Sequence, residues 1–172
     1  MFKRIENNID FAENEDKISN YWNDIDAFQK SLDIRKESKI FRFYDGPPFP
    51  TGSPHYGNLL AGVIKDIVPR YWTMRGYFVE RRFGWDVHGL PIEMEVQKEL
   101  GLEDPQDIDD YGIDKFNEAC RSQVQTNTEN WEKITRKIGR WVDFENDYKT
   151  MDVGFMESVW WVFKELFDKN LI

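Results

Sequence analysis

Metal-binding and redox-active residues are scarce in this sequence, which holds one cysteine, Cys120, and two histidines among 172 residues. A single cysteine excludes a disulfide within the chain and is typical of proteins from a reducing compartment. One cysteine and two histidines are also too few for a structural zinc site, so we predict no metal site. The sequence has no apolar run long enough to span a bilayer, and its N-terminus lacks the apolar core of a signal peptide. We therefore expect a cytoplasmic protein with no membrane partner.

Basic residues are outnumbered, because 23 lysines and arginines stand against 32 aspartates and glutamates and the formal net charge is −9. This balance argues against binding of a nucleic-acid backbone by this chain alone, since such binding needs a basic surface. Neither the Gly-Lys-Ser/Thr end of a Walker loop nor the Gly-x-Gly-x-x-Gly dinucleotide turn is present. Apolar residues are plentiful: 40% of the chain is hydrophobic and seven residues are tryptophan, enough for one folded domain with a helical appendage.

The densest combination of turn and polar residues lies in residues 43–58. An apolar segment leads through a loop with four prolines into a predicted helix that opens with His55, Tyr56, Gly57 and Asn58. The first N–H groups of a helix lack partners and the helix dipole favours negative charge there, so this junction suits an anionic ligand. His55 and Asn58 lie three residues apart on one helical face, and Gly57 leaves room for a flat group such as a purine. Equally, both side chains could serve only as helix caps.

Hydrophobic periodicity and capping residues divide the chain into strands and helices. The predicted strands cover residues 40–44 and 77–83; the predicted helices cover residues 14–32 with Asn14 as cap, 56–75, 90–100, a short helix starting at Pro105, a long stripe over 113–141, and 152–170. Pro69 is expected to bend the second helix without ending it. The last helix is apolar around most of its girth, so we expect it to be buried between layers or beneath sequence outside this chain. Strand, helix and strand predict a parallel βαβ unit.

A second polar loop, residues 84–91, follows the second predicted strand. Ligands of open α/β sheets bind at the carboxyl ends of the strands, so both loops are expected at the same edge of the sheet. Asp86 is suited to bind an ammonium group through a charge-assisted hydrogen bond, and His88 adds a second polar side chain. Alternatively, these two residues only cap the helix that begins near Leu90.

Residues 54–58, Pro-His-Tyr-Gly-Asn, resemble the His-x-Gly-His signature of class I aminoacyl-tRNA synthetases. Residues 44–48 and 82–91 are similar to the isoleucyl-tRNA synthetases in particular, and further similar segments extend the resemblance over nearly the whole chain. The resemblance implies an α/β fold: the first half of a class I synthetase Rossmann domain, a parallel-sheet nucleotide-binding domain, with a leading helix and long trailing helices. It places a helical appendage at residues 1–38 and the half-domain at residues 39–172, truncated before the editing insertion of the family.

The activity that the resemblance implies is the ATP-dependent attachment of L-isoleucine to tRNA(Ile) through an isoleucyl-adenylate, with ATP and magnesium (Mg) required and a monomeric parent enzyme. The implied catalytic residues are His55 and Asn58, which contact the ATP phosphates. The implied ATP site adds Gly46, Pro54 and Gly57, with Gly57 against the adenine. The implied amino-acid site consists of Pro47, Pro48, Asp86 and His88, with Asp86 on the α-amino group. The signature region as a whole comprises Pro48, Phe49, Pro50, Thr51, Gly52, Ser53, Pro54, His55, Tyr56, Gly57 and Asn58.

The chain departs from the family pattern in three respects. Asn58 replaces the second histidine of the signature, keeping a hydrogen-bond donor without the charge, and Val87 replaces the usual cysteine or threonine. The Lys-Met-Ser-Lys-Ser signature, which stabilises the pyrophosphate leaving group, is absent, so we expect the 172 residues alone to be inactive, with tRNA bound mainly through other regions. Two alternatives stay open. A valyl or leucyl enzyme is disfavoured by the residues after Asp86, and a non-catalytic binding protein with the same fold is disfavoured by the polar residues of the two loops.

Overall fold

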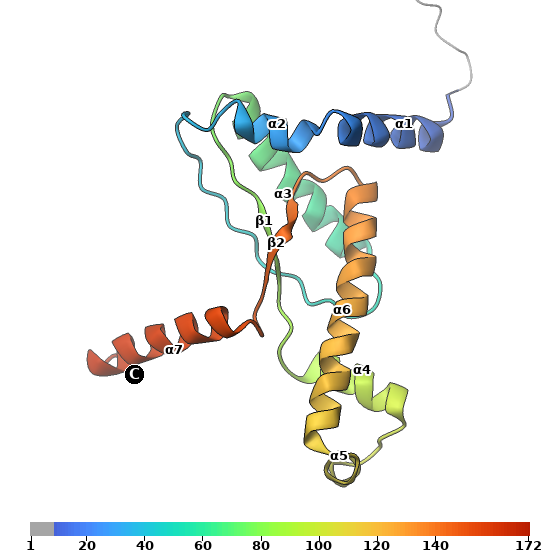
Figure 1. Cartoon of the computed structure of the whole chain (residues 1–172), viewed down its shortest axis with the longest axis vertical. Helices are drawn as coiled ribbons and strands as arrows, with labels where there is room; N and C mark the ends of the chain where they lie inside the picture. Colours follow the sequence, from blue (N-terminus) through green and yellow to red (C-terminus); the bar gives the residue numbers. More distant parts are fainter. Residues whose placement is uncertain (1–8) are drawn as a thin grey trace, which may run out of the picture.

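The computed structural model describes residues 9–172 as a mixed α/β arrangement with a small parallel sheet (Figure 1). In chain order the elements are α1 (Phe11–Asp24), α2 (Ala27–Asp33), α3 (Tyr56–Met74), β1 (Arg82–Trp85), α4 (Leu90–Leu100), α5 (Pro105–Tyr111), α6 (Ile113–Lys137), β2 (Asp143–Lys149) and α7 (Val153–Asp168). Helices α4 and α5 lie at one end of α6, while α1 and α2 lie towards the other end of the molecule (Figure 1). Within the described residues, no helix has both the length and the apolar character that a membrane crossing requires.

The sheet pairs β1 with β2 in parallel, with Arg82 opposite Asp143 and Gly84 opposite Tyr148. Helices α4, α5 and α6 form the crossover that parallel neighbours require. The second predicted strand, residues 77–83, is shifted in the structure. The pairing begins only at Arg82, because β2 accompanies the chain from that residue onward.

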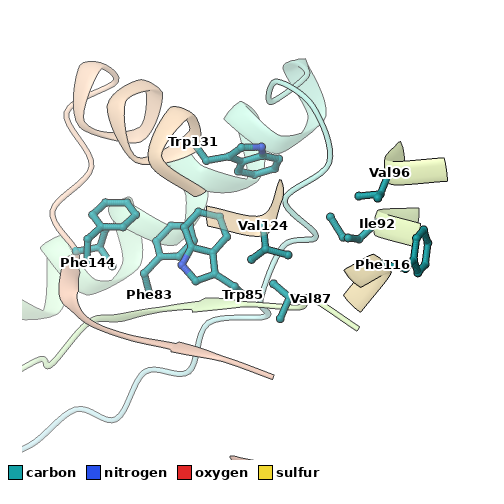
Figure 2. Packing of buried hydrophobic residues seen from close by; sticks show 10 residues of the cluster. Phe83, Trp85, Val87, Ile92, Val96, Phe116, Val124, Trp131 and Phe144 are labelled. Carbon is teal, nitrogen blue, oxygen red and sulfur yellow. The ribbon is translucent and has the colours of Figure 1, made fainter. Parts of the chain in front are cut away.

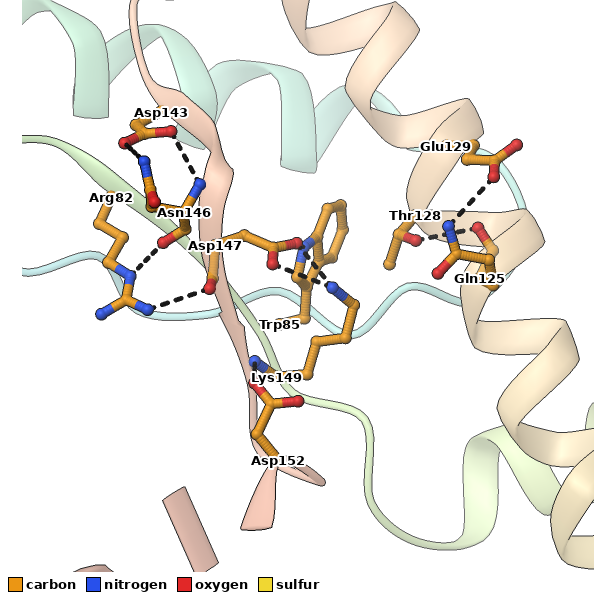
Figure 3. Close-up of polar contacts among 10 residues, drawn as sticks. All are labelled: Arg82, Trp85, Gln125, Thr128, Glu129, Asp143, Asn146, Asp147, Lys149 and Asp152. Carbon is orange, nitrogen blue, oxygen red and sulfur yellow. Dashed lines mark hydrogen bonds and ion pairs between the residues drawn. The ribbon is translucent and has the colours of Figure 1, made fainter. Parts of the chain in front are cut away.

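The sequence does not predict β2, because its residues, Asp-Phe-Glu-Asn-Asp-Tyr-Lys, lack the apolar alternation that signals a strand. Side chains of β1 compensate for this polarity (Figure 3). Arg82 Nη2 donates to the backbone carbonyl of Asp147 at 3.1 Å, and Trp85 Nε1 donates to the Asp147 carboxylate at 2.7 Å. Lys149 Nζ lies 2.8 Å from the same carboxylate. A charged strand is thus held by partners that no local pattern reveals.

The first predicted strand, residues 40–44, is wrong beyond a single parallel bridge between Ile40 and Phe78. At this bridge the Phe41 N–H donates to the Phe78 carbonyl at 2.9 Å, and the Phe78 N–H donates to the Lys39 carbonyl at 3.0 Å. The parallel direction agrees with the predicted βαβ unit. Beyond the bridge this segment forms no further ladder within the described residues, and the paired strands there are β1 and β2.

The N-terminal part of the chain forms two helices where one helix is predicted over residues 14–32. The Asp10 carboxylate caps α1 by accepting a hydrogen bond from the Glu13 N–H at 3.0 Å, so the predicted cap at Asn14 is wrong. Asp26, between the helices, has a φ angle of +50°. This left-handed conformation ends the first helix and redirects the chain into the second.

Aromatic residues join these two helices to the rest of the chain. Trp22 of α1 packs edge-to-face on Trp141, with ring centroids 5.3 Å apart, and Phe28 of α2 lies 6.2 Å from the same ring. From α3, the Arg70 guanidinium lies 4.2 Å from the centre of the Trp141 ring. Its Nη2 also donates to the Gly139 carbonyl at 2.9 Å. The first helices, α3 and the segment after α6 therefore meet at one cluster.

The buried core centres on the two aromatic residues of β1 (Figure 2). Phe83 and Trp85 point to the same face, since side chains alternate along a strand. Phe83 stacks on Phe144 of β2 at 4.6 Å, and Trp85 meets Trp131 of α6 edge-on at 6.2 Å. Towards α4 and the start of α6 the cluster continues with Val87, Ile92, Val96, Phe116 and Val124. The core thus fixes the direction in which β1 delivers the loop that follows it.

Several helices agree with the sequence prediction. Helix α3 passes through Pro69 and ends just before Gly76. Helix α4 runs to Leu100, and α5 begins at Pro105. Helix α6 is shorter than the predicted stripe over residues 113–141, because it stops at Lys137. Proline and glycine signals are local, which is why they mark these boundaries well.

Helix α7 is exposed in this chain, so its predicted burial between layers is wrong here. It projects away from the sheet and from α6 (Figure 1). Trp160 is 68% exposed and Phe163 is 50% exposed. One face of α3, including Leu60 and Ile67, is exposed as well. Apolar periodicity identifies both helices correctly, but it does not tell which residues of this chain cover them.

Candidate functional site

Residues 45–55, here called the strap, connect the bridge at the start of the sheet to α3. Helix α6 holds the strap from one side. Asn127 Nδ2 donates to the Pro50 carbonyl at 2.7 Å, and Trp131 Nε1 donates to the Gly52 carbonyl at 2.8 Å. Both donor residues are buried. Since prolines also restrict the backbone of the strap, its shape is fixed before any ligand arrives.

The carboxylate of Asp45 ties the start of the strap to two other elements. Its Oδ1 lies 2.5 Å from Lys65 Nζ of α3, and its Oδ2 lies 2.5 Å from Nη2 of Arg140. Lys65 Nζ also donates to the Gly46 carbonyl at 2.7 Å. The side chains of Asp45 and Arg140 are 1% and 6% exposed. A carboxylate buried between two cations is a structural ion network that locates the strap relative to α3.

The two polar loops meet at the carboxyl end of β1, as the sequence predicts. The Asp86 N–H donates to the Pro48 carbonyl at 3.0 Å, which links the second loop directly to the strap. The Val87 N–H donates to Thr150 Oγ1 at 2.9 Å, which links the same loop to the residue after β2. The loop after β1 is therefore held on both sides, and the half-buried Asp86 lies beside the strap.

The alternative in which Asp86 or His88 caps α4 is wrong. The N-cap of α4 is Gly89, whose φ angle is +93°, and no side chain of the described residues bonds to the first turn. Glycine suits this position because other residues adopt a positive φ angle only with strain. The side chains of Asp86 and His88 are thus not used as caps.

His55 and Asn58 do cap α3. The N-cap is His55, whose Nδ1 accepts a hydrogen bond from the Gly57 N–H at 3.1 Å. The backbone N–H of His55 donates to Asn58 Oδ1 at 3.0 Å, which completes a reciprocal capping box. The capping itself is confirmed, and it uses only one nitrogen of the imidazole. Since His55 is exposed, its Nε2 remains accessible to a ligand.

A cavity of about 180 Å³ lies between the strap, α3 and α6. Four predicted site residues line it together: Gly46, Pro48, Pro54 and Asn58. Lys65 and Arg140, the two partners of Asp45, contribute its polar wall. Pro47 is half-buried in the strap, while Gly57 is exposed at the start of α3. The structure therefore gathers the residues predicted from the first loop around one helix N-terminus.

His88 lies apart from this cavity. It lines a second cavity, of about 200 Å³, which it shares with Glu93, Cys120 and Met156. Burial, aided by the Glu93 carboxylate, raises the pKa of the Cys120 thiol. The thiol therefore stays protonated at neutral pH and is a poor nucleophile.

Sequence reasoning missed the residues that hold the strap. Asp45, Lys65 and Arg140 are far apart in the chain, and so are the residues of α6 that reach the strap carbonyls. A helical pattern predicts a surface position for Asn127 and a core position for Trp131. No local signal indicates that either side chain binds a loop. The placement of Asp45 just before the prolines is the only hint that the sequence offers.

The family described as tRNA synthetases class I (I, L, M and V) matches residues 17–172. Isoleucine–tRNA ligase of Treponema denticola is 53% identical over 172 residues, which is 100% of this chain and 16% of that protein. The cytoplasmic isoleucine–tRNA ligase of Saccharomyces cerevisiae is 52% identical over 162 residues, covering 94% of this chain and 15% of that protein. The chain thus spans about one sixth of the length of these relatives.

Among solved structures, the fold is similar to LeuRS in the ternary complex of Agrobacterium radiobacter K84 agnB2 LeuRS with tRNA and LeuAMS. The TM-score is 0.65 at 19% identity, covering 91% of this chain and 18% of that one. At this identity the likeness concerns the fold alone. It agrees with the predicted α/β class and with a Rossmann-like arrangement.

Proposed function

Because the chain belongs to the class I tRNA synthetases (I, L, M and V), we propose that it forms the part of an isoleucine–tRNA ligase where ATP and L-isoleucine meet. The observation that carries this proposal is the hydrogen bond from the Asp86 N–H to the Pro48 carbonyl, 3.0 Å long. It joins a loop suited to an ammonium group to a strap that ends at a helix N-terminus. Identities of 52–53% to isoleucine–tRNA ligases support isoleucine as the amino acid.

On the ATP side, the phosphates would lie at the N-terminus of α3. The helix dipole favours negative charge there. His55 Nε2, which the capping bonds leave unused, would donate a hydrogen bond to a phosphate oxygen, and Asn58 lies in the same first turn. Gly46 and Pro54 shape the strap on which the nucleotide rests, and Gly57 belongs to the same surface. These roles are the ones that the family resemblance implies for these residues.

On the amino-acid side, the Asp86 carboxylate would accept a hydrogen bond from the α-ammonium group of isoleucine. Pro47 and Pro48 present apolar rings next to it and would contact the aliphatic side chain. His88 supports this region from the second loop, although it lines a separate cavity. The apolar character of the strap suits a branched hydrocarbon, while discrimination of one methylene by such a pocket is limited.

The reaction of this site would be the formation of isoleucyl-adenylate. A carboxylate oxygen of isoleucine attacks the α-phosphorus of ATP, the bond from that phosphorus to the bridging oxygen breaks, and pyrophosphate leaves with the electron pair. Such a step needs positioning of the reactants and stabilisation of charge, and it needs no covalent nucleophile from the protein. The adenylate would then pass isoleucine to tRNA(Ile), which binds mainly through regions outside this chain. The parent enzyme is proposed to be a monomer.

In this proposal magnesium would accompany ATP. Within residues 9–172, no group of three or more His, Cys, Asp or Glu side chains is arranged to hold a metal ion. The carboxylate of the strap, Asp45, is occupied by Lys65 and Arg140. The residues of this chain would act on ATP through hydrogen bonds and the dipole of α3.

The same proposal divides the chain at residue 38. Residues 1–38 would be the helical appendage, of which residues 1–8 lie outside the described residues. Residues 39–172 would be the first half of the catalytic domain. Trp22 and Phe28 of the appendage pack on Trp141 of that half-domain, so the two parts are in direct contact.

The proposal predicts that the 172-residue chain binds an isoleucyl-adenylate analogue but does not catalyse ATP–pyrophosphate exchange, since the lysine signature is absent. Equilibrium dialysis with non-hydrolysable isoleucyl, valyl and leucyl adenylate analogues measures the binding. We expect preference for the isoleucyl compound. His55→Ala is expected to weaken its binding about tenfold, through loss of one hydrogen bond to a charged group.

Asp86→Asn is the matched variant for the other half of the site. It should weaken binding of the isoleucyl-adenylate analogue about tenfold and leave the affinity for ATP unchanged, because only the analogue carries the ammonium group. If the chain preferred the valyl or leucyl analogue, the proposed amino acid would be valine or leucine and not isoleucine. Absence of any adenylate binding would favour a non-catalytic protein that retains the fold, and exchange activity above background would contradict the predicted inactivity.

A further inference from the structure

The side chains at the N-terminus of α3 hold each other in one defined arrangement. The Gly57 N–H is a donor, so the His55 Nδ1 that lies 3.1 Å away must be the unprotonated acceptor nitrogen. A neutral imidazole carries its proton on the other nitrogen, which is Nε2. In the same way, the N–H of His55 requires the oxygen of the Asn58 amide, at 3.0 Å, as its partner.

Gly57 completes this arrangement by being small. A Cβ atom at position 57 would lie 2.9 Å from Cε1 of His55 and 3.1 Å from its Nδ1. These distances are below van der Waals contact, and the nearby atoms belong to a ring that is itself hydrogen-bonded to Gly57. The space over Gly57 is therefore filled by the imidazole of His55. Glycine at position 57 therefore leaves room for the His55 ring.

We propose that Asn58 is a positioning residue that presents His55 to phosphate as the Nε2–H tautomer. Phosphate oxygens only accept hydrogen bonds, so a neutral histidine is useful to them only if its accessible nitrogen carries the proton. Asn58 acts through the backbone of His55: its bond holds the N-cap with φ −90° and ψ 170°, which lays the ring over Gly57. This inference rests on the proposed function only in taking phosphate as the ligand.

The arrangement also accounts for asparagine at a position where the family signature has histidine. The side-chain oxygen of a residue in the first turn reaches back to the N-cap N–H, and amide or carboxylate side chains are suited to this role. A direct contact between Asn58 and phosphate is the competing role that the resemblance implies. Asn58→Gln distinguishes the two roles. A glutamine side chain can still accept the hydrogen bond from the N-cap N–H, so it would preserve the positioning role. Its amide nitrogen would lie elsewhere, so it would not preserve a direct contact with phosphate.

Nitrogen-15 NMR of the labelled 172-residue chain tests the arrangement directly. The chain has two histidines, so signals lost in His55→Gln identify those of His55. For the neutral imidazole, we expect the Nε2–H tautomer and a scalar coupling across the hydrogen bond between the Gly57 N–H and Nδ1. Both should persist in Asn58→Gln. In Asn58→Ala the coupling should vanish and the tautomers should mix.

ATP titration of the same samples supplies the functional readout. Affinity is expected to fall about tenfold in Asn58→Ala and to be restored in Asn58→Gln, in step with the coupling. An Nδ1–H tautomer in the unmodified chain, or a coupling that survives Asn58→Ala, would overturn the positioning role. Loss of affinity in Asn58→Gln with the coupling intact would assign Asn58 to direct phosphate contact instead. If the couplings follow expectation while ATP perturbs no His55 signal, the proposed function fails and the capping arrangement stands.

Discussion

Replacing Asp45 with alanine is expected to lower the free energy of unfolding by about 3 kcal/mol, near the lower end of the range for breaking a buried ion pair. The variant leaves Arg140, which is 6% exposed, without its carboxylate partner. Lys65 is 27% exposed and can turn towards water, which limits the loss. Urea denaturation followed by circular dichroism measures the change.

The same variant should also release the start of the strap. Asp45→Asn keeps a hydrogen-bond acceptor for Arg140 and is expected to lose less stability than Asp45→Ala. The matched control is Asp168→Ala, which removes an ion pair with Lys164 on the exposed face of α7 and should leave the urea midpoint unchanged. Equal midpoints for Asp45→Ala and this control would show that the ion network does not stabilise the fold.

Trp85→Ala is expected to lower the free energy of unfolding by about 3–5 kcal/mol, which is a large part of the stability of a small domain. The side chain is 1% exposed and lies between Phe83, at 4.5 Å, and Trp131, at 6.2 Å. Its Nε1 also donates to the Asp147 carboxylate, so the variant removes core volume and one link to β2 together. Thermal unfolding followed by near-ultraviolet circular dichroism reports the loss of the aromatic cluster.

Trp85→Phe separates the two contributions. Phenylalanine keeps most of the buried area, and Lys149 still pairs with Asp147 at 2.8 Å, so the expected loss is about 1 kcal/mol. A loss as large as that of Trp85→Ala would mean that the hydrogen bond to β2, rather than core packing, dominates at this position.

The sequence predicts the fold where the signals are local. Proline and glycine mark the limits of α4 and α5, and α3 continues through Pro69 as expected, because these residues act on their own backbone. The strand β2 escapes prediction because its partners, Arg82 and Trp85, lie about 60 residues away in the chain. The ladder predicted at residues 40–44 fails for a related reason, since a strand depends on the neighbour that pairs with it.

The candidate site shows the same division. The strap and Asp86 meet where the carboxyl edge of a parallel sheet is expected, although residues 40–44 contribute only the bridge between Ile40 and Phe78. The reciprocal bonds of His55 and Asn58 follow from their spacing, and here capping and ligand binding are compatible because they use different nitrogens of the imidazole. The supports of the strap, Asp45 and Trp131, are tertiary and carry no sequence pattern.

Amide chemical-shift mapping with a non-hydrolysable isoleucyl-adenylate analogue tests most directly whether the strap, the start of α3 and the loop at Asp86 form one site. The nitrogen-15-labelled chain is titrated with the analogue, and the shift of every assigned amide is followed. The account predicts that the largest shifts fall on residues 45–58 and 86–88, with matching saturation in both loops. Saturating shifts confined to one loop, or centred on Glu93, Cys120 and Met156, would contradict it.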